Sequence, residues 1–468
     1  MLSSPAVEII SECFIQPKYT PKEECRKPLQ LSHWDLQLLT VHYNQKGLLF
    51  AKPPSFNTDE NQMKDFLEKL KDSLSIALVH FYPLAGRLAT LPQETPPTCS
   101  VYVDCANGPG AKFIRASLNL TVKDILSLIH VPKIVYSFFD HVGAINYDGH
   151  NLPLMTIQVT ELIDGIFIGP SINHSLVDGT SFWHFINSWS EIFNAKKIQG
   201  MMDQPTFSTV LSRPPIHKRW IPEEYGPILS LPFSHPDEFI FRYHDEFPEL
   251  KEKVFYISSD SLQKLKAKAK AECGTATIST FQALGAHVWR CITRARNLPP
   301  DETTRFCFSV DNRSRISPPL SPDYFGNSIQ VLATTVTCGE LMNNGLGWAA
   351  RKLNELVINQ TDKSAREWAE SWAKVPTFGN LAKLGVGNIV QVGSSPRFNV
   401  YGSDFGLGKA LAVRSGFGNK FDGKIMLFPA REGGGNIEME VCLLPSFMTC
   451  FESDDELLQI VSEPSPMS

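Results

Sequence analysis

The 468-residue sequence lacks a long hydrophobic run, a block of basic residues and any CxxC pair of cysteines. No stretch approaches the roughly 18 uninterrupted apolar residues of a membrane-spanning helix, so we expect no membrane span. The net charge is −5 and no basic stripe is present, so nucleic acid is not an expected partner. The first residues lack the basic start and the apolar run of a secretory signal, and we therefore expect a cytoplasmic protein.

The 10 cysteines are scattered along the chain. In a cytoplasmic protein this predicts reduced, mostly buried thiols and no structural zinc site. The sequence also has no GxSxG, no GxxxxGK[ST] and no HExxH. These absences argue against a nucleophile-elbow serine hydrolase, a P-loop nucleotide enzyme and a zinc protease. The triplet DFG at 404–406 occurs in protein kinases, but no glycine-rich loop or HRD accompanies it here, so a kinase is not expected.

A chain of this length is expected to form two domains. Residues 58–81 form the clearest amphipathic helix, with Phe66, Leu70, Leu74 and Leu78 at helical spacing. We also expect helices at about 180–195 and within 277–296, and a hairpin over 424–445. Alternating helix and strand patterns in both halves predict an α/β protein with mixed sheets. The proline-rich segment 201–250 predicts a linker between an N-terminal domain, 1–200, and a C-terminal domain, 251–468.

The stretch INHSLVDGTSF (172–182) places His174 four residues before Asp178. By spacing alone, two interpretations remain open. His174 is a catalytic base with Asp178 as its structural partner, or it is a satisfied histidine at a strand end and Asp178 caps the next helix. An imidazole that emerges from a strand suits proton abstraction near neutral pH. Gly179 leaves room for a close approach.

Six motifs follow one another along the chain in the order found in the plant BAHD acyltransferases, the coenzyme A-dependent family that the sequence resembles over nearly its whole length. They are LSHWDL (31–36), HFYPLAGRL (80–88), NHSLVDGTSFWHF (173–185), STFQALGAHVWR (279–290), VDNRSRISPPLSPDYFGN (310–327) and DFGLG (404–408). Any single motif gives modest support for this resemblance, whereas six motifs in the family's order are very specific to the family.

The resemblance implies two domains of chloramphenicol-acetyltransferase type with an active-site channel between them. His174 would be the general base that deprotonates a hydroxyl or amine of a small specialised metabolite. Acyl-CoA would be the cosubstrate of a monomer with no metal and no tightly bound cofactor. Asp178 would point away from the substrate and pair with an arginine, for which Arg313 is the best candidate. The resemblance also gives a structural role to Gly179, Asp404, Gly406 and Gly408.

Two positions depart from the family pattern. Leu407 stands where the family's DFGWG loop has Trp, and it fills less of an apolar slot. Pro396 aligns with a second Trp, and Ser394 aligns with a Thr that helps to settle the oxyanion in some members. Ser394 could still donate a hydrogen bond, whereas Pro396 has no N–H. Ser279 and Thr280 lie where the family usually meets coenzyme A, although simple N-capping by Ser279 is an equal alternative.

Two further stretches, HYNQKGLLFAKP (42–53) and REGGGNIEMEVCL (431–443), resemble a little-characterised branch of the family that includes unassigned acetyltransferases and a lyase. Three hypotheses follow. The leading one is an acyl-CoA-dependent acyltransferase. The second is a lyase of the same fold that splits a small-molecule conjugate without coenzyme A. The third is a non-catalytic scaffold or interaction protein.

Overall fold

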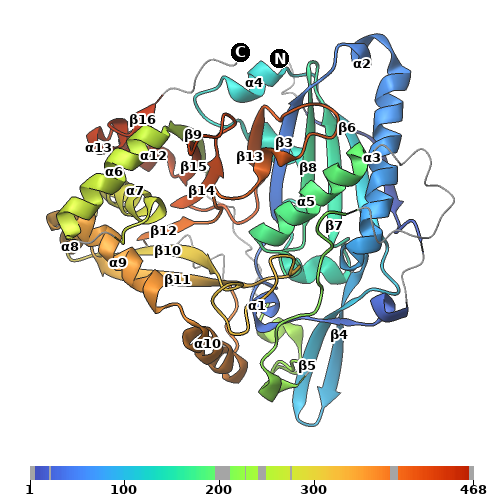
Figure 1. Cartoon of the computed structure of the whole chain (residues 1–468), viewed down its shortest axis with the longest axis horizontal. Coiled ribbons are helices and arrows are strands. Elements are labelled where there is room, and N and C mark those ends of the chain that lie inside the picture. Colours follow the sequence, from blue (N-terminus) through green and yellow to red (C-terminus); the bar gives the residue numbers. More distant parts are fainter. Residues whose placement is uncertain are drawn as a thin grey trace.

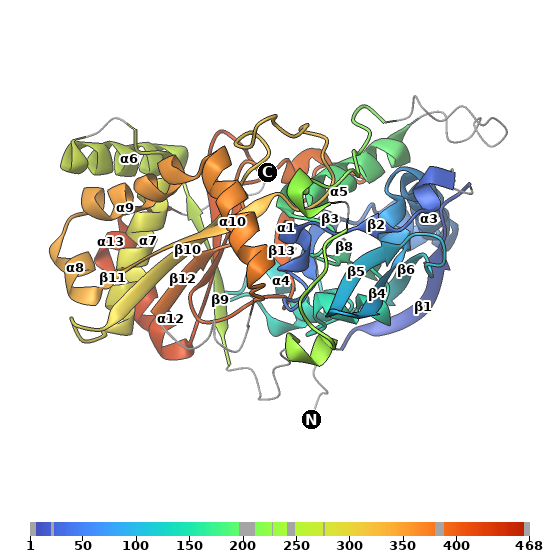
Figure 2. The same ribbon diagram turned by 90° about the horizontal axis from the view of Figure 1, so that it is seen from below.

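The computed structural model describes residues 6–19, 23–195, 211–226, 228–240, 249–274, 277–379 and 388–462. Figure 1 shows two halves side by side, each built on a sheet with helices packed on it. Elements from the N-terminal part of the chain, in blue to green, form one half. Elements in yellow to red form most of the other, and Figure 2 shows the same division after a quarter turn.

The sheet of the N-terminal half contains the strand that leads to His174. Its strands lie in the order β1 (Glu8–Ile15), β6 (Ala111–Ser117), β7 (Met155–Glu161), β8 (Gly165–Ile172), β3 (Asn44–Ala51) and β13 (Ala412–Ser415). Neighbours are antiparallel except β6 and β7, which are parallel. Every residue of β8 is buried, because the sheet is covered on both faces. Such a strand positions the loop after it firmly.

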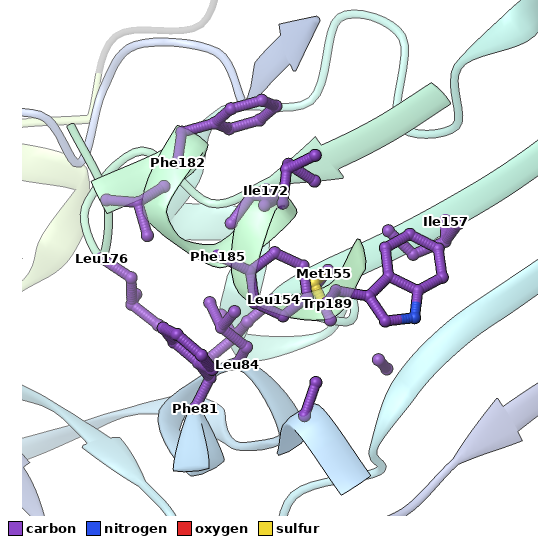
Figure 3. Close-up of a cluster of buried hydrophobic side chains, with 14 of the residues drawn as sticks. Phe81, Leu84, Leu154, Met155, Ile157, Ile172, Leu176, Phe182, Phe185 and Trp189 are labelled. Carbon is purple, nitrogen blue, oxygen red and sulfur yellow. The ribbon is translucent and has the colours of Figure 1, made fainter. Parts of the chain in front are cut away.

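Two helices, α3 (Glu60–His80) and α5 (Gly179–Asn194), pack on one face of this sheet. The predicted helix over 58–81 is confirmed as α3, and its four periodic apolar side chains are buried. The helix predicted at about 180–195 is confirmed as α5. Figure 3 shows Phe182, Phe185 and Trp189 of α5 among Ile172, Leu154 and Phe81. This apolar contact fixes the start of α5, where Asp178 lies.

The sheet of the C-terminal half is larger. Its strands lie in the order β11 (Ile329–Thr337), β10 (Thr303–Asp311), β12 (Asn388–Val392), β14 (Lys424–Pro429), β15 (Ile437–Leu443), β9 (Lys251–Ile257) and β16 (Val461–Ser462). The predicted hairpin over 424–445 is confirmed as the antiparallel pair β14 and β15. The helices α6 (Ser259–Cys273), α7 (Thr280–Arg296) and α9 (Leu346–Asn359) pack together and share one buried core with this sheet.

A small third sheet has the order β2 (Leu29–Gln30), β5 (Pro97–Asp104) and β4 (Arg87–Glu94). The other α-helices of the described residues are α1 (His33–Leu36), α2 (Ser55–Thr58), α4 (Val122–Leu126), α8 (Cys338–Asn343), α10 (Asp362–Lys374), α12 (Pro445–Glu452) and α13 (Asp455–Leu458). Turns of 3-10 helix occur at Glu23–Arg26, Tyr82–Ala85, Lys133–Phe138, Asn146–His150, Glu223–Tyr225, Pro236–Glu238 and Val400–Gly402. Within the described residues, no helix combines the length and the apolar character needed to cross a membrane.

Strand β13 crosses from the C-terminal part of the chain to the N-terminal sheet. It pairs with β3 in the register Ala412↔Leu49 to Ser415↔Lys46, so it covers what would otherwise be the edge of that sheet. The chain before β13 lies against α5. The two halves are therefore interlocked, and β13 within 251–468 belongs to the sheet of the N-terminal half. The expected boundaries at 200 and 250 stay a prediction, because 196–210 and 241–248 lie outside the described residues.

Candidate active site

His174 and Asp178 lie in the short loop between β8 and α5. Asp178 is the N-cap of α5, and its Oδ1 accepts a hydrogen bond of 2.9 Å from the backbone N–H of Ser181. An acidic N-cap satisfies one free N–H of the first turn and interacts favourably with the helix dipole. Of the two interpretations of the stretch, the capping role of Asp178 is therefore present in the structure.

Arg313 contacts the same carboxylate with both terminal nitrogens of its guanidinium. Its Nη1 lies 2.7 Å from Asp178 Oδ2, and its Nη2 lies 3.1 Å from Oδ1. The backbone N–H of Ser328 donates a further hydrogen bond of 3.0 Å to Oδ2. Arg313 Nη2 also donates to the carbonyl oxygens of Tyr324 and Gly326. Such a two-pronged pair holds two chain segments at a defined angle.

Asp178 is fully buried, so its charge depends on these partners. Burial opposes ionisation, but the charge and the hydrogen bonds of Arg313 outweigh it and hold the pKa of Asp178 below its ordinary value. Every hydrogen bond of its carboxylate comes from Arg313, Ser181 or Ser328 among the described residues. Asp178 is thus an anchor of the loop, with its oxygens directed into the protein.

The backbone of His174 is held on both sides by asparagines. Its N–H donates to Asn146 Oδ1 at 2.7 Å, and its carbonyl accepts from Asn327 Nδ2 at 2.8 Å. Asn146 and Asn327 are fully buried. Because both peptide groups of the residue are engaged, the direction in which the imidazole leaves the backbone is restricted.

Asn327 is in turn held by a second buried ion pair. Its Nδ2 also donates to Asp35 Oδ1 at 2.9 Å, and Arg219 Nε lies 2.8 Å from Asp35 Oδ2. Asp35 belongs to the short helix α1 and also accepts hydrogen bonds from Ser32, its N-cap. The first and fifth sequence motifs, LSHWDL and VDNRSRISPPLSPDYFGN, therefore meet behind His174.

Sequence reasoning missed Asp35, Asn146, Arg219 and Asn327. Asp35 and Asn327 do lie inside two of the quoted motifs, LSHWDL and the stretch that ends at 327, which was the available sign of a role. Asn146 and Arg219 lie outside every quoted motif. Neither local periodicity nor residue type indicated that their side chains reach the His174 loop.

The imidazole of His174 is half-buried, and its Nδ1 is enclosed without a hydrogen bond to another described residue. Burial and the nearby positive charge of Lys46 lower the pKa of His174 to about 4. The ring is therefore neutral at physiological pH and able to accept a proton. Because Nδ1 is enclosed, the opposite nitrogen, Nε2, is the one available to a substrate.

Gly179 has a packing role that its sequence position did not indicate. A Cβ added there would lie 2.6 Å from Cζ of the Phe398 ring. The side chain of Phe398, in the segment before β13, thus packs directly on the first turn of α5. The space left by Gly179 is occupied by Phe398, which fastens the two halves together at the loop that carries His174.

The DFG-containing loop packs on the other end of α5. Asp404 Oδ1 accepts from Asn194 Nδ2 at 2.6 Å, and the Asp404 N–H donates to Ser190 Oγ at 3.1 Å. Phe405 is fully buried against Trp189 and Phe193, with a positive φ of 47°. Gly406 and Gly408, at φ 72° and 79°, provide the turns beside it. Leu407 is half-buried against the same core. The contacts of this loop with α5 lie at the C-terminal end of the helix, whereas the His174 loop precedes its N-terminal end.

The remaining predicted residues lie in two places. Ser394 follows β12, is buried, and its Oγ has no hydrogen-bond partner among the described residues. Its neighbour Pro396 is half-buried. Ser279 caps α7, and its Oγ accepts from the N–H of Gln282 at 3.2 Å. The capping alternative for Ser279 is thus present, and Thr280 begins the helix.

Two clusters of metal-ligand type occur in the described part of the chain: His287 with Cys291 and Glu456, and Glu252 with Glu440 and Cys442. Neither includes His174. Both carboxylates of the second cluster contact Lys420 Nζ. In the first cluster, His287 Nε2 lies 3.0 Å from the carbonyl oxygen of Glu456. Because these groups are used in internal contacts, we assign them no metal.

Comparison with known proteins agrees with this arrangement. The sequence profile of the Transferase family matches residues 5–458. An uncharacterized acetyltransferase of Arabidopsis thaliana is 36% identical over 463 residues, which cover 97% of this chain and 99% of that protein. The BAHD acyltransferase DCR of the same plant is 32% identical over 459 residues, which cover 97% of this chain and 92% of that protein.

Solved structures show the same fold. Vinorine synthase superposes with a TM-score of 0.68 at 21% identity, covering 97% of this chain and 98% of that one. The protein TRI101 of F. sporotrichioides, in a complex with coenzyme A and T-2, superposes with a TM-score of 0.69 at 16% identity. The superposition covers 93% of this chain and 99% of that one. The family profile and the curated relatives show that the present chain is an acyltransferase of the plant BAHD family. Its two interlocked sheet-and-helix halves have the two-domain fold of chloramphenicol-acetyltransferase type.

Proposed function

We propose that this enzyme transfers an acyl group from acyl-CoA to a hydroxyl or amine of a small specialised metabolite, with His174 as the general base. One observation supports this above all: a neutral imidazole is held through its backbone by Asn146 and Asn327, while Asp178 is fully engaged with Arg313. This arrangement supports a division of roles in which His174 accepts the proton and Asp178 holds the loop.

In the proposed reaction, Nε2 of His174 takes the proton of the acceptor hydroxyl or amine. The acceptor oxygen or nitrogen forms a bond to the thioester carbonyl carbon. This carbon becomes tetrahedral, and the electron pair of the C=O π bond moves to the carbonyl oxygen, which becomes an oxyanion. The oxyanion collapses, the C–S bond breaks, and the CoA thiolate takes the proton from His174. A positioned base contributes typically ~10²–10⁴-fold to the rate, and holding both substrates together contributes further.

Other residues act in support. Asp178 and Arg313 are positioning residues, as are Gly179 and the loop of Asp404, Gly406 and Gly408. Ser394 is proposed to donate its unpaired Oγ–H to the oxyanion, since no other described acceptor takes it. Ser279 and Thr280 are proposed to approach coenzyme A at the start of α7 through backbone N–H groups. The enzyme is further proposed to work as a cytoplasmic monomer without a metal or a tightly bound cofactor.

The test is release of free CoA thiol by the purified protein. A panel of acyl-CoAs is first screened by thermal shift, because a bound donor raises the melting temperature by mass action. Acceptors are then offered with the donors that bind. His174→Ala is expected to lower kcat by about 10²–10⁴-fold. His235→Ala, an exposed histidine of the linker, is the matched control and is expected to leave kcat unchanged.

Each outcome discriminates between the hypotheses. Full turnover by His174→Ala would refute the assignment of the base. Cleavage of a single conjugate without any CoA dependence would replace transfer by the lyase alternative. Biological function that survives loss of His174, together with no binding of any acyl-CoA, would favour a non-catalytic scaffold.

A further inference from the structure

Two buried lysines take no part in the proposed proton transfer, although the charges of both act on His174. On β3, Asn44 pairs with Ile172, two positions before His174, and Lys46 follows Asn44 on the same face of the sheet. Lys46 is on β3, on the face of the sheet that α5 covers, and is 5% exposed. Its Nζ lies 5.1 Å from the ring centroid of Phe182, in the first turns of α5. Lys424 begins β14 and is 8% exposed. A Cβ added to Gly393, next to Ser394, would lie 2.9 Å from Lys424 Nζ.

Neither ammonium group has a carboxylate partner among the described residues. Lys46 Nζ donates to the amide oxygen of Asn44 and otherwise faces the Phe182 ring. Lys424 Nζ lies 5.8 Å from the centroid of Phe421 and forms no ion pair with any described residue. Aromatic rings attract a cation, but more weakly than an anion does.

Two other lysines with buried side chains do have carboxylate partners. Lys420 contacts both Glu252 and Glu440, and the nitrogen of Lys52 lies 2.7 Å from Glu161. These pairs show the ordinary solution for a lysine in the protein interior, since an isolated charge is costly to remove from water. Lys46 and Lys424 are therefore exceptions. Both lie where the two large sheets meet: Ser415, which pairs with Lys46, donates to Glu440, and Glu440 pairs with Met426 of β14, the strand that Lys424 begins.

The charges of the two lysines act on each other and on His174. Burial and the charge of Lys424 lower the pKa of Lys46 to about 7, and burial lowers the pKa of Lys424 to about 8. Both charges contribute to the lowered pKa of His174. The carboxylates of Asp178 and Glu440 raise the pKa of Lys46, but their effect is smaller than that of burial and Lys424. Asp178 is paired with Arg313 and Glu440 with Lys420, so neither forms an ion pair with Lys46 or Lys424.

We propose that Lys46 and Lys424 form an anion-binding subsite beside His174 that receives a carboxylate carried by the substrate. This inference rests on the proposed function, because it takes His174 as the place where acceptor and thioester meet. In an acyl-CoA the pantetheine arm separates the thioester from the phosphates, so an anion beside His174 belongs to the acyl group or to the acceptor. Lys46 and Lys424 are thus specificity-determining residues for an acid-bearing substrate.

A binding experiment tests the subsite without turnover. Thermal shift at constant ionic strength compares benzoate with benzamide, as models of an aromatic acid acceptor, and malonyl-CoA with acetyl-CoA, as acid and neutral donors. The wild-type protein is expected to bind the acid member of one pair at least tenfold more tightly. The pair that responds identifies the source of the carboxylate. Equal binding within both pairs would overturn the proposal.

Variants then assign the preference to the lysines. Lys46→Met and Lys424→Met are each expected to weaken binding of the acid ligand by roughly ten- to hundredfold, the range for loss of a hydrogen bond to a charged group. Binding of the neutral ligand should weaken by less than threefold. Lys46→Arg is expected to retain most of the preference. Lys52→Met, which removes a paired lysine, is the control and should leave the preference unchanged. Equal weakening of acid and neutral ligands by Lys46→Met would overturn the subsite.

Stability provides a readout that does not depend on a ligand. Because Lys46 lacks an anionic partner, Lys46→Met is expected to leave the melting temperature of the free protein unchanged or raised, whereas Lys420→Met should lower it. A large loss in Lys46→Met would show that Lys46 is structural and would overturn the proposal. His174→Ala separates the two ideas, since it should lose turnover and keep the acid preference. If His174→Ala keeps full turnover, the assignment of the base fails. The proposal for the two lysines is then still decided by the binding measurements alone.

Discussion

Arg313 Nη1 lies 2.7 Å from Asp178 Oδ2, although the two residues are 135 positions apart in the chain. The pair is almost fully enclosed, with side-chain exposures of 6% and 0%. It joins the segment after β10 in the C-terminal half to the loop after β8 in the N-terminal half. This buried ion pair therefore helps to fix the relative position of the two halves at His174, together with the contact of Phe398 with Gly179.

Removal of the Asp178 carboxylate should destabilise the protein strongly. Asp178→Ala leaves Arg313 buried without its main anion and removes the cap of α5, and we expect a loss of about 3–5 kcal/mol in the free energy of unfolding. Asp178→Asn keeps a capping oxygen and should lose less. Urea denaturation followed by tryptophan fluorescence measures the difference. The control is Asp237→Ala, an exposed acid, and a similar loss in that variant would contradict the assignment.

Asn327→Ala should lower kcat more than it changes KM. The variant removes the donor to the His174 carbonyl and leaves Asp35 with one hydrogen bond fewer. A less restricted imidazole is expected to reduce kcat by about 10–100-fold, since small misplacements of a catalytic group have effects of this size. Steady-state kinetics well below the melting temperature provides the measurement. Asn187→Ala, in the middle of α5, serves as the control. Unchanged kcat in Asn327→Ala would show that the backbone contact does not position the base.

The pH dependence of kcat/KM should differ from that of an ordinary histidine. Burial and Lys46 lower the pKa of His174 to about 4, so its neutral, proton-accepting form persists as the pH falls through 6.5 and is lost only near 4. At pH 5.5 an unperturbed imidazole would be about nine-tenths protonated. We therefore expect most of the kcat/KM value to remain at that pH. A decline centred near 6.5 would indicate that the base is not held in this environment.

The DFG-containing loop should affect stability and leave the chemistry of the folded enzyme intact. Phe405→Ala removes a fully buried ring beside Trp189 and is expected to cost about 3–5 kcal/mol. Leu407→Ala should cost less, because Leu407 is only half-buried. Calorimetric melting together with kcat per folded molecule distinguishes the two effects. A loss of kcat in Leu407→Ala without loss of stability would place the loop in the catalytic machinery.

Features that depend on neighbouring residues were predictable from the sequence. The period of Phe66, Leu70, Leu74 and Leu78 predicted α3, because the spacing of apolar residues in a helix is a local property. The hairpin of β14 and β15 was predicted for the same reason. The ordered motifs indicated the family, and with it the fold and the class of enzyme. These conclusions needed no knowledge of which segments meet in space.

Only the tertiary structure decided how the site is held and charged. Asp35 and Asn327 are 292 positions apart, yet together they support the backbone of His174. Lys46 and Lys424 belong to different sheets, and only burial shows that one lysine is left without an anion while Lys420 is paired. The physical reason is that hydrogen bonding and desolvation depend on the path of the whole backbone, which no local pattern contains. The sequence determined that an HxxxD loop would follow a buried strand, and the fold decided which charges surround it.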